Sequence, residues 1–526
     1  MATGITEMTR GKALIRLRPH ALAALTLLGA QATPALAANW RFTPELLLRE
    51  TYSDNYNLAP SGSEQSGFVT EIAPGFTVTG EGRRSQFRAT YQARSVIYTG
   101  GNSGSNFQNY LDAGGRAELI DDFLFIDGSA NISNVSTSAF GPQALDSTYA
   151  TGNRSEVRTY TISPYARKRF GSLAQGEVRY THQGVSSDTG GFSNYNSDRL
   201  NASVSSGEAY RTLGWDVAGS TQQSSYSDLD SVRSDYVNGT LRYRLTDQFS
   251  LTSSAGYERY TYETVGDAPS GASWSVGFDW KPSARTSLAA TAGRRFYGSA
   301  YSLNGSHRSR YTTWNLSYNE DITTQQEQFA NSGSVSTSSF LNQAFLTNIP
   351  DPVARSQAVD AFIRATNLPA TLANGNQGLS NRFFLQKRLQ ASVAFTAAKS
   401  TAVLSVYDTL RRPQSDNTAN SGFGNSSFGN SNAFFSDETR QRGVSGLYSL
   451  RLSTLSTMNL NAQYYRTTSL LSNITDDNKL VTLGLSHQFS PRTTGTVELR
   501  RYQGSFNQTG SDFRENAISA YLSMRL

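Results

Sequence analysis

The stretch ISAYLSMRL, residues 518–526, ends the chain with apolar and polar side chains in strict alternation. The apolar positions are Ile518, Ala520, Leu522, Met524 and Leu526, and the polar positions are Ser519, Tyr521, Ser523 and Arg525. A period of two places the two kinds of side chain on opposite faces of a β-strand. In a soluble sheet the apolar face would meet a core, whereas in an outer-membrane barrel it meets lipid and the polar face lines the lumen.

Composition favours a large β protein. The chain has 526 residues, no Cys, 27 Tyr and 27 Phe, with a mean hydropathy of −0.45. A chain this polar lacks the run of about 20 apolar residues that a transmembrane helix needs. Its aromatic content is nevertheless too high for a disordered chain.

The first 37 residues are predicted to be a cleaved secretory signal. Basic residues between Arg10 and Arg18 precede a short apolar run, Ala21–Leu28, and Ala35-Leu36-Ala37 is an A-x-A cleavage site. Removing this segment takes away four basic residues and one acid, which lowers the net charge from +6 to +3. This mild basic balance gives little reason to expect nucleic acid as a partner. The mature domain is expected to span residues 38–526.

Alternation recurs along the chain. Predicted strands include Arg41–Tyr52, Gly67–Gly80, Gln86–Tyr98, Tyr236–Leu245, Ser273–Pro282 and Thr493–Tyr502. In one of them Phe87 and Tyr91 share a face, and Arg88 and Arg94 share the other. Several strands carry a charge at every second position. A barrel encloses such a face around water, whereas a soluble sandwich would expose it.

The spacing of turns supports a barrel. Short turns are predicted near Arg83, Asp121, Gly171, Ala209, Asp247, Ala284 and Asp321, then near Lys399, Leu452 and Pro491. Longer polar loops lie between them, for example at residues 137–154, and are expected on the outer side. A propeller blade of about 40–45 residues has a similar period. Each period here holds two strands of roughly 10–14 residues, the length needed to cross a bilayer at a tilt.

These turns lead to an all-β fold, a large antiparallel transmembrane β-barrel of about 22 strands (range 18–24) with a small helical insertion. Both chain ends should lie on the periplasmic side, so the strand number should be even. The strands before and after residues 323–380 must alternate in direction for the barrel to close. This alternation holds only if a tight turn at Glu320-Asp321 leads into a strand at Thr323–Ala330.

The insertion, residues 331–380, is predicted to contain a helix. Asp351 can cap it, and Pro352 suits its first position. Val359, Phe362 and Ile363 lie on one face and are candidates for a plug, because a barrel this wide leaks unless something fills it. The alternative is a helix packed on the outer loops.

Several short segments stand out in the mature chain: Phe42-Thr43-Pro44, residues 50–55 (ETYSDN), Leu58-Ala59-Pro60, residues 68–71 (FVTE), Pro74-Gly75, Gly80-Glu81-Gly82 and residues 317–320 (SYNE). Taken together they resemble the outer-membrane β-barrel proteins associated with PEP-CTERM (exosortase) systems. The resemblance spans essentially the whole mature chain, and its opening segment is the most specific part. The resemblance implies a setting in exopolysaccharide biosynthesis and export, with export components as partners. That family has no agreed catalytic or ligand residues. The terminal strand is similar to the signal read by the barrel-assembly machinery, although Leu526 stands where Phe or Trp is usual.

Arginine is the main candidate for a functional lumen face. The predicted lumen-lining residues are Arg88, Arg94, Arg116, Arg158, Arg242, Arg244, Arg295, Arg388 and Arg500. Rings of arginine favour anions, and Tyr side chains interleaved with them can stack on sugars. A polysaccharide could pass such a wall. Alternatively, Arg–Glu pairs fill a large polar interior for structural reasons.

The sequence predicts no enzyme, no cofactor and no metal site. His182, His307 and His487 lack metal-ligand spacing. His182 stands in a stretch similar to the His-x-Ser motif of outer-membrane phospholipases, but Gly184 occupies the position of the nucleophile. The leading hypothesis is therefore an outer-membrane channel for exopolysaccharide export or anchoring. A general porin and a surface attachment barrel without transport are the alternatives.

Overall fold

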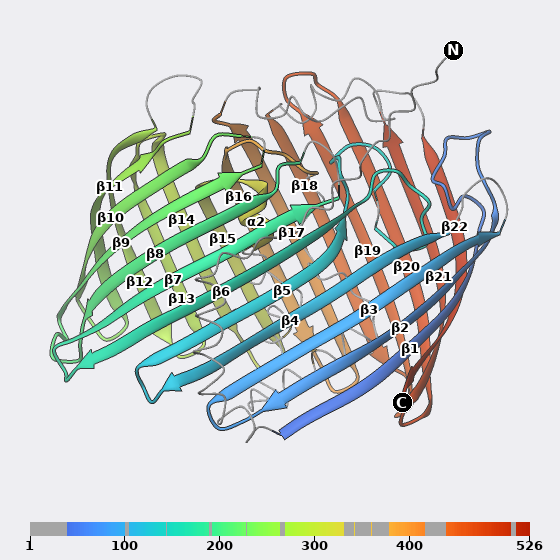
Figure 1. Ribbon diagram of the computed structural model, residues 1–526, viewed down its shortest axis with the longest axis horizontal. Helices are drawn as coiled ribbons and strands as arrows, with labels where there is room; N and C mark the ends of the chain where they lie inside the picture. The colour runs from blue at the N-terminus through green and yellow to red at the C-terminus, as the bar shows by residue number, and fades with distance from the viewer. Residues whose placement is uncertain are drawn as a thin grey trace, which may run out of the picture.

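The computed structural model is a closed antiparallel barrel of 22 strands (Figure 1). It describes residues 39–99, 105–143, 145–188, 192–227, 229–262, 269–330, 341, 359, 378–415, 438–506 and 512–526. The predicted signal, residues 1–37, lies outside them. The strands are β1 (Asn39–Ser53), β2 (Gly67–Glu81), β3 (Ser85–Thr99), β4 (Asn106–Ile120), β5 (Leu124–Val135), β6 (Ser155–Phe170), β7 (Ala174–Ser187), β8 (Tyr195–Ser206), β9 (Leu213–Tyr226), β10 (Val232–Arg244), β11 (Phe249–Tyr260), β12 (Ser270–Ser283), β13 (Thr286–Arg295), β14 (Gly298–Arg308), β15 (Thr312–Thr323), β16 (Phe384–Thr396), β17 (Ser400–Pro413), β18 (Thr439–Arg451), β19 (Ser456–Ser469), β20 (Thr475–Ser490), β21 (Thr493–Phe506) and β22 (Phe513–Arg525). One helix, α2 (Gln325–Ala330), follows β15.

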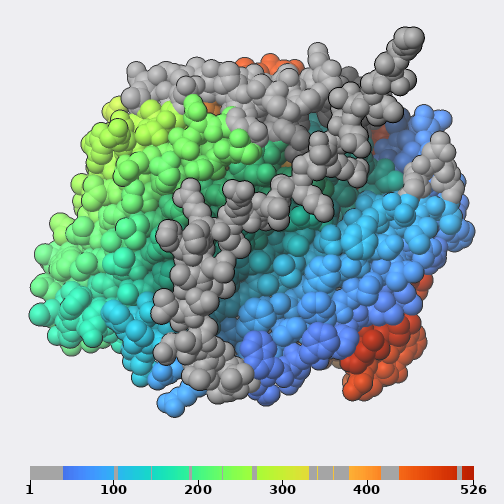
Figure 2. All heavy atoms as spheres, in the orientation of Figure 1, coloured from blue at the N-terminus to red at the C-terminus, as the bar shows by residue number. Residues whose placement is uncertain are grey.

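The barrel closes through its two terminal strands. β1 pairs with β22 in a register that runs from Glu45↔Arg525 to Ser53↔Ala517. The alternating C-terminal stretch is therefore hydrogen-bonded on both sides, to β1 and to β21. Closure leaves the sheet without an edge strand on which another chain could add. Each strand pairs with its sequence neighbours, so strands adjacent in sequence lie side by side around the wall (Figure 1). On the face in view in Figure 2 the colour passes from blue to green in chain order.

The two faces of the wall differ as the alternation predicts. On β12, Trp274 and Val276 are each 53% exposed on the outer face, and Ser275 between them faces inward and bonds to Ser254 of β11. Because paired residues of adjacent strands share a face, this assignment extends around the barrel through the register. Among the described residues, no helix combines the length and the apolar character required to cross a bilayer.

One predicted strand is wrong. Residues 325–330 form α2 rather than a strand, and β15 continues through the predicted turn at Glu320-Asp321 as far as Thr323. The missing reversal lies earlier, at residues 309–311 between β14 and β15. It contains no Gly or Pro; instead the Ser309 hydroxyl accepts a hydrogen bond from the Thr312 amide at 3.0 Å. The strand number of 22 is confirmed, but the strand before the insertion ends differently.

Connections alternate in length around the barrel. One end, which we call the short-turn end, has connections of a few residues, such as 82–84, 171–173 and 491–492. The other, the long-loop end, carries most of the longer connections, although residues 296–297 make a tight hairpin between β13 and β14. The first residue of β1 and the last residue of β22 both lie at the short-turn end, as expected for a barrel with an even number of strands.

Candidate functional site

The connection between β5 and β6 folds into the lumen. We call residues 136–154 the inward loop; residue 144 is not described. Buried side chains along it include Ser136, Phe140, Gln143, Thr148, Tyr149 and Asn153. The connection leaves the wall at the long-loop end, as expected, but it folds into the barrel and does not project from it. A loop that buries this many polar groups needs partners for them. Some lie within the loop, as for Asn153, and others are supplied by the barrel wall.

Asp146, near the tip of the inward loop, is held by two arginines of the wall. Arg49 of β1 donates to both carboxylate oxygens at 3.2 Å, and Arg500 of β21 lies 3.2 Å from one of them. Both arginine side chains are almost completely buried, at 5% and 2% exposure. Thr148 donates its amide and its hydroxyl to the same carboxylate, at 2.9 and 2.7 Å. We call Asp146, Arg49 and Arg500 the arginine clamp.

The clamp controls the ionisation of Asp146. Burial by itself raises the pKa of this carboxyl, but the positive charges of Arg49 and Arg500 and the Thr148 hydrogen bonds outweigh burial and hold the pKa well below its usual value. Opposite charges at this distance, shielded from water, interact strongly. Asp146 therefore docks as a carboxylate anion.

A pH dependence follows. The folded-state pKa of Asp146 is lowered, so its contribution to loop docking is present above the unfolded pKa of about 3.9 and is lost as the pH falls through the folded value. In planar bilayers we expect single-channel conductance to stay low and constant between about pH 8 and pH 4, and to rise only in stronger acid. Asp146→Asn should remove this acid response. A conductance that rises between about pH 7 and pH 5 would contradict this assignment.

Further contacts fasten both flanks of the loop. Ser147 donates to Glu71 of β2 at 2.8 Å, and the Gly141 amide donates to Asp476 of β20 at 2.8 Å. Tyr149 packs on Tyr502 with ring centroids 5.6 Å apart, in an apolar cluster with Leu58, Leu480 and Phe513. The loop thus touches strands on both sides of the β1–β22 seam.

Helix α2 lies inside the barrel, in contact with β6, β7 and β9 on one part of the wall and with β17 on another. Thr324 caps it: the Glu327 amide donates to the Thr324 hydroxyl at 3.1 Å, and the Thr324 amide donates back to the Glu327 carboxylate at 3.4 Å. Arg411 of β17 donates to Gln325 and Gln328 of the helix at 2.9 and 2.6 Å. Burial raises the pKa of Glu327.

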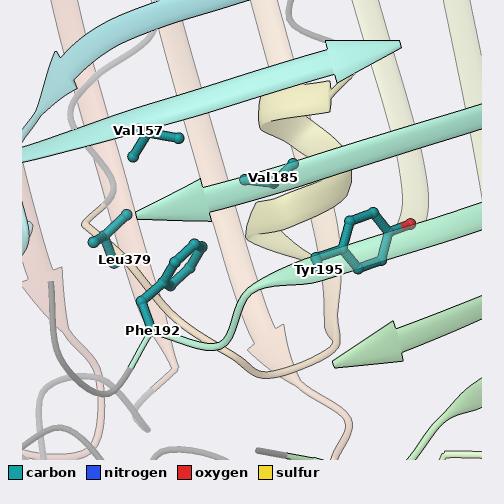
Figure 3. Packing of buried hydrophobic residues seen from close by; sticks show 5 residues of the cluster. All are labelled: Val157, Val185, Phe192, Tyr195 and Leu379. Carbon is teal, nitrogen blue, oxygen red and sulfur yellow. The ribbon is translucent and has the colours of Figure 1, made fainter. Parts of the chain in front are cut away.

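The two lumen elements meet through residues 378–383. The Leu379 amide donates to the carbonyl of Thr137 in the inward loop at 2.7 Å, and Gln326 of α2 donates to Asn381 at 3.1 Å. Leu379 also packs with Val157, Val185, Phe192 and Tyr195 of the wall and its loops (Figure 3). Together the inward loop, α2 and residues 378–383 form a connected body inside the barrel, which we call the plug.

Most of the predicted arginines face the lumen. By register, Arg88, Arg94, Arg116, Arg242, Arg244, Arg295, Arg388 and Arg500 point inward. Arg94 lies 3.4 Å from Glu71, Arg116 pairs with Asp127 at 2.7 Å and Arg295 with Glu258 at 2.7 Å. Arg116 and Arg242 are 64% and 61% exposed to the lumen nearer the short-turn end, so charged side chains line that part of the wall.

Arg158 is placed differently. It shares a face with Tyr160 and Ile162, whose side chains are exposed on the outside of the barrel, and it pairs there with Glu156 at 2.6 Å. Its position is close to the long-loop end of β6, so an outward charge there is not in the apolar part of the wall.

The predicted plug candidates are only partly described. Val359 is helical and fully buried. Phe362 and Ile363 lie outside the described residues, as does most of the insertion, so the plug role of residues 331–380 stays a prediction.

Alternation alone could have identified two of the missed residues. Arg49 and Glu71 occupy inward positions of predicted strands and are nearly fully buried, whereas Glu515 lies in the part of β22 that precedes the predicted terminal strand. Asp146 had no comparable signal, because nothing local distinguishes a loop carboxylate that docks from one that is solvated.

His182 does not form a hydrolase site. It bonds to Asp198 at 2.8 Å on the outer face, and the Tyr160 ring covers Gly184 so closely that a side chain at this position would collide with it. Within the described residues, no three His, Cys, Asp or Glu side chains are grouped so as to hold a metal ion.

No family model and no curated relative matches the chain. Among solved structures, the FrpB iron transporter from Neisseria meningitidis in its apoprotein form is 10% identical with a TM-score of 0.49, over 94% of this chain and 83% of that chain. The siderophore receptor PirA from Pseudomonas aeruginosa is 9% identical with a TM-score of 0.44, over 92% and 80%. Likeness at this level gives no basis for transferring what those proteins bind.

Proposed function

We propose that this protein is an outer-membrane channel, closed by its plug in the conformation described, that serves the export of an exopolysaccharide. The observation that carries the membrane placement is an apolar band around the outer face. We consider the half of each strand that lies nearer the short-turn end. Among the described outward positions in these halves, one residue is charged, Lys168. Elsewhere such charges begin eight positions from that end, as at Asp198, Asp408 and Arg501. Eight residues of tilted strand span roughly 20 Å, close to the apolar band of a bacterial barrel.

The lumen supports a hydroxyl-rich substrate. On the inner face of β10–β14 a hollow of about 280 Å³ is lined by residues that include Asn238, Ser254, Ser275, Thr291 and Ser302. Hydroxyl and amide groups of this kind exchange hydrogen bonds with sugars at little cost. Exposed arginines nearer the short-turn end add affinity for acidic sugar units.

The plug favours a gated channel over a general porin. A porin conducts small solutes continuously, whereas here the inward loop is ion-paired to the wall in mid-lumen. Anchoring of a polymer without transport would use the same barrel, and the experiment below separates these functions.

Deletion of the gene in its host is expected to reduce secreted exopolysaccharide at least several-fold, because the polymer loses its path across the outer membrane. The readout is cell-free polymer, measured separately from polymer bound to the cell. Complementation with the intact chain is the control. Wild-type levels of both cell-free and cell-bound polymer would contradict a role in export. Loss of the cell-bound polymer alone would favour anchoring. High resting conductance of the purified protein would favour a porin.

A further inference from the structure

Charge is distributed unevenly on the outer face above the apolar band. On β17–β22 the outward positions carry seven basic residues, Arg412, Arg440, Arg442, Arg466, Lys479, Arg501 and Arg514, and two acids, Asp408 and Asp477. We call these nine residues the basic collar.

The rest of the outer face is balanced. Among the described strands β1–β16, the outward positions above the band hold Arg158, Arg233, Arg259, Arg294 and Lys387 against Glu50, Glu156, Asp198, Asp235 and Glu320. Five bases therefore meet five acids, and the excess of positive charge is confined to the basic collar.

Three basic side chains of the collar make no ion pair with a described residue. Asp477 pairs with Arg466, and Asp408 pairs with Arg440 and Arg442. Arg412 pairs at 3.3 Å with Glu438, which immediately precedes β18. Lys479, Arg501 and Arg514 are exposed and have no such carboxylate partner in the described part of the chain. The guanidinium groups of Arg501 and Arg514 converge on the side-chain amide of Gln503, at 3.0 and 3.2 Å.

These three residues lie directly at the edge of the apolar band. Register places Lys479, Gln503 and Arg514 in one row across β20–β22, and Val481, Arg501 and Asn516 in the next. The row below is entirely apolar, with Leu483, Leu499 and Ile518 exposed by 40%, 51% and 48%. An amphipathic molecule that binds here would place its polar headgroup against the cations and its apolar chains against the apolar row.

A hollow of about 600 Å³ opens over this boundary. Lys479, Gln503 and Arg514 line it together with four acids, Asp54, Glu64, Asp477 and Asp512, so anion binding here rests on the exposed bases of the two rows and not on the hollow as a whole. Asp54 already accepts two hydrogen bonds from Asn516, at 2.7 Å each, so it is engaged within the wall.

We propose that the basic collar binds a phosphate-bearing glycolipid of the outer leaflet, with its phosphates on Lys479, Arg501 and Arg514 and its acyl chains on the apolar row below. Arginine forks match phosphate oxygens, and basic groups at a membrane surface attract anionic headgroups. The inference rests on the membrane placement in the proposed function. It assigns one sector of the barrel, rather than its whole circumference, to this lipid.

The test compares three forms of the full chain in neutral detergent: wild type, the triple variant Lys479→Glu/Arg501→Glu/Arg514→Glu, and a control with equal charge change on the same face, Arg158→Glu/Arg259→Glu/Arg294→Glu. The probe is fluorescent lipid A. At about fivefold per basic residue, the triple variant should bind about a hundredfold more weakly than wild type. The control should stay within about threefold, because its charges lie outside the collar.

Equal binding by wild type and triple variant would overturn the proposal, as would undiminished binding of dephosphorylated lipid A. Full competition by inorganic pyrophosphate, with no gain from the acyl chains, would also overturn it. If the glutamate variant fails to fold, Lys479→Gln/Arg501→Gln/Arg514→Gln replaces it. Flotation of wild type with phosphatidylcholine vesicles reports membrane insertion separately, so failure of the proposed function is visible independently of lipid binding.

Discussion

Replacing residues 139–152 of the inward loop by a Gly-Ser-Gly-Ser turn is expected to raise single-channel conductance on the order of tenfold or more. Barrels of 16–18 strands already leave an aqueous channel, and this one has 22. The replacement removes Asp146 and Tyr149, which attach the inward loop to the wall beside the β1–β22 seam. It leaves the sequence of every strand unchanged. The measurement is conductance of the purified protein in planar bilayers.

A matched replacement of residues 227–231, between β9 and β10, is the control. It shortens a connection at the same end of the barrel without touching the arginine clamp, so conductance should stay at the wild-type level. An unchanged conductance in the inward-loop variant, with the barrel folded, would show that α2 and residues 378–383 close the lumen without it.

Arg500→Ala is expected to lower the free energy of unfolding by about 3–5 kcal/mol, the cost of breaking a buried ion pair by removing one partner. Arg500 donates to Glu515 at 2.7 Å and lies 3.2 Å from Asp146, and the Arg500 and Glu515 side chains are 2% and 0% exposed. Removing the guanidinium leaves two carboxylates without this partner in a site that water barely reaches. Denaturant-induced unfolding in detergent micelles measures the loss.

Arg244→Ala is the matched control for this second variant. Arg244 also faces the lumen, but its side chain is exposed, so its removal should change stability by less than about 0.5 kcal/mol. Arg500→Lys keeps the charge but loses the two-pronged geometry, and it should fall between wild type and Arg500→Ala. Equal stability of the Arg500→Ala and Arg244→Ala variants would mean that the clamp contributes nothing to the fold.

The two experiments examine different properties of the same contact. Loop replacement asks whether the clamp closes the lumen, and Arg500→Ala asks whether it stabilises the barrel. Three arginines and three glutamates of the wall, Arg49, Arg94, Arg500, Glu71, Glu498 and Glu515, surround the loop tip. Because these six charges balance without Asp146, the loop can leave without stranding a net charge on the wall.

Several features followed from the sequence alone, because they depend on local alternation. The period of two placed Phe87 outside and Arg88 inside, and it extended to the last residues of the chain, which close the barrel. The strand number of 22 followed from strand polarity and parity along the chain, although the strand that completed the count was placed at residues 323–330 and not after the reversal at 309–311. The alternation itself is set within about ten neighbouring residues, so a single sequence contains that information.

Other features depended on the tertiary structure. Ser309 makes a turn with its side chain rather than through Gly or Pro, so the reversal between β14 and β15 had no strong local signal. Arg158 was predicted inside because of its charge, but its strand continues beyond the apolar band, where an outward charge reaches headgroups or water. The docking of Asp146 depends on arginines from β1 and β21, far away in the chain and adjacent only after the barrel closes. No local pattern records a contact that exists only between distant strands, which is why the plug, unlike the wall, required the folded structure.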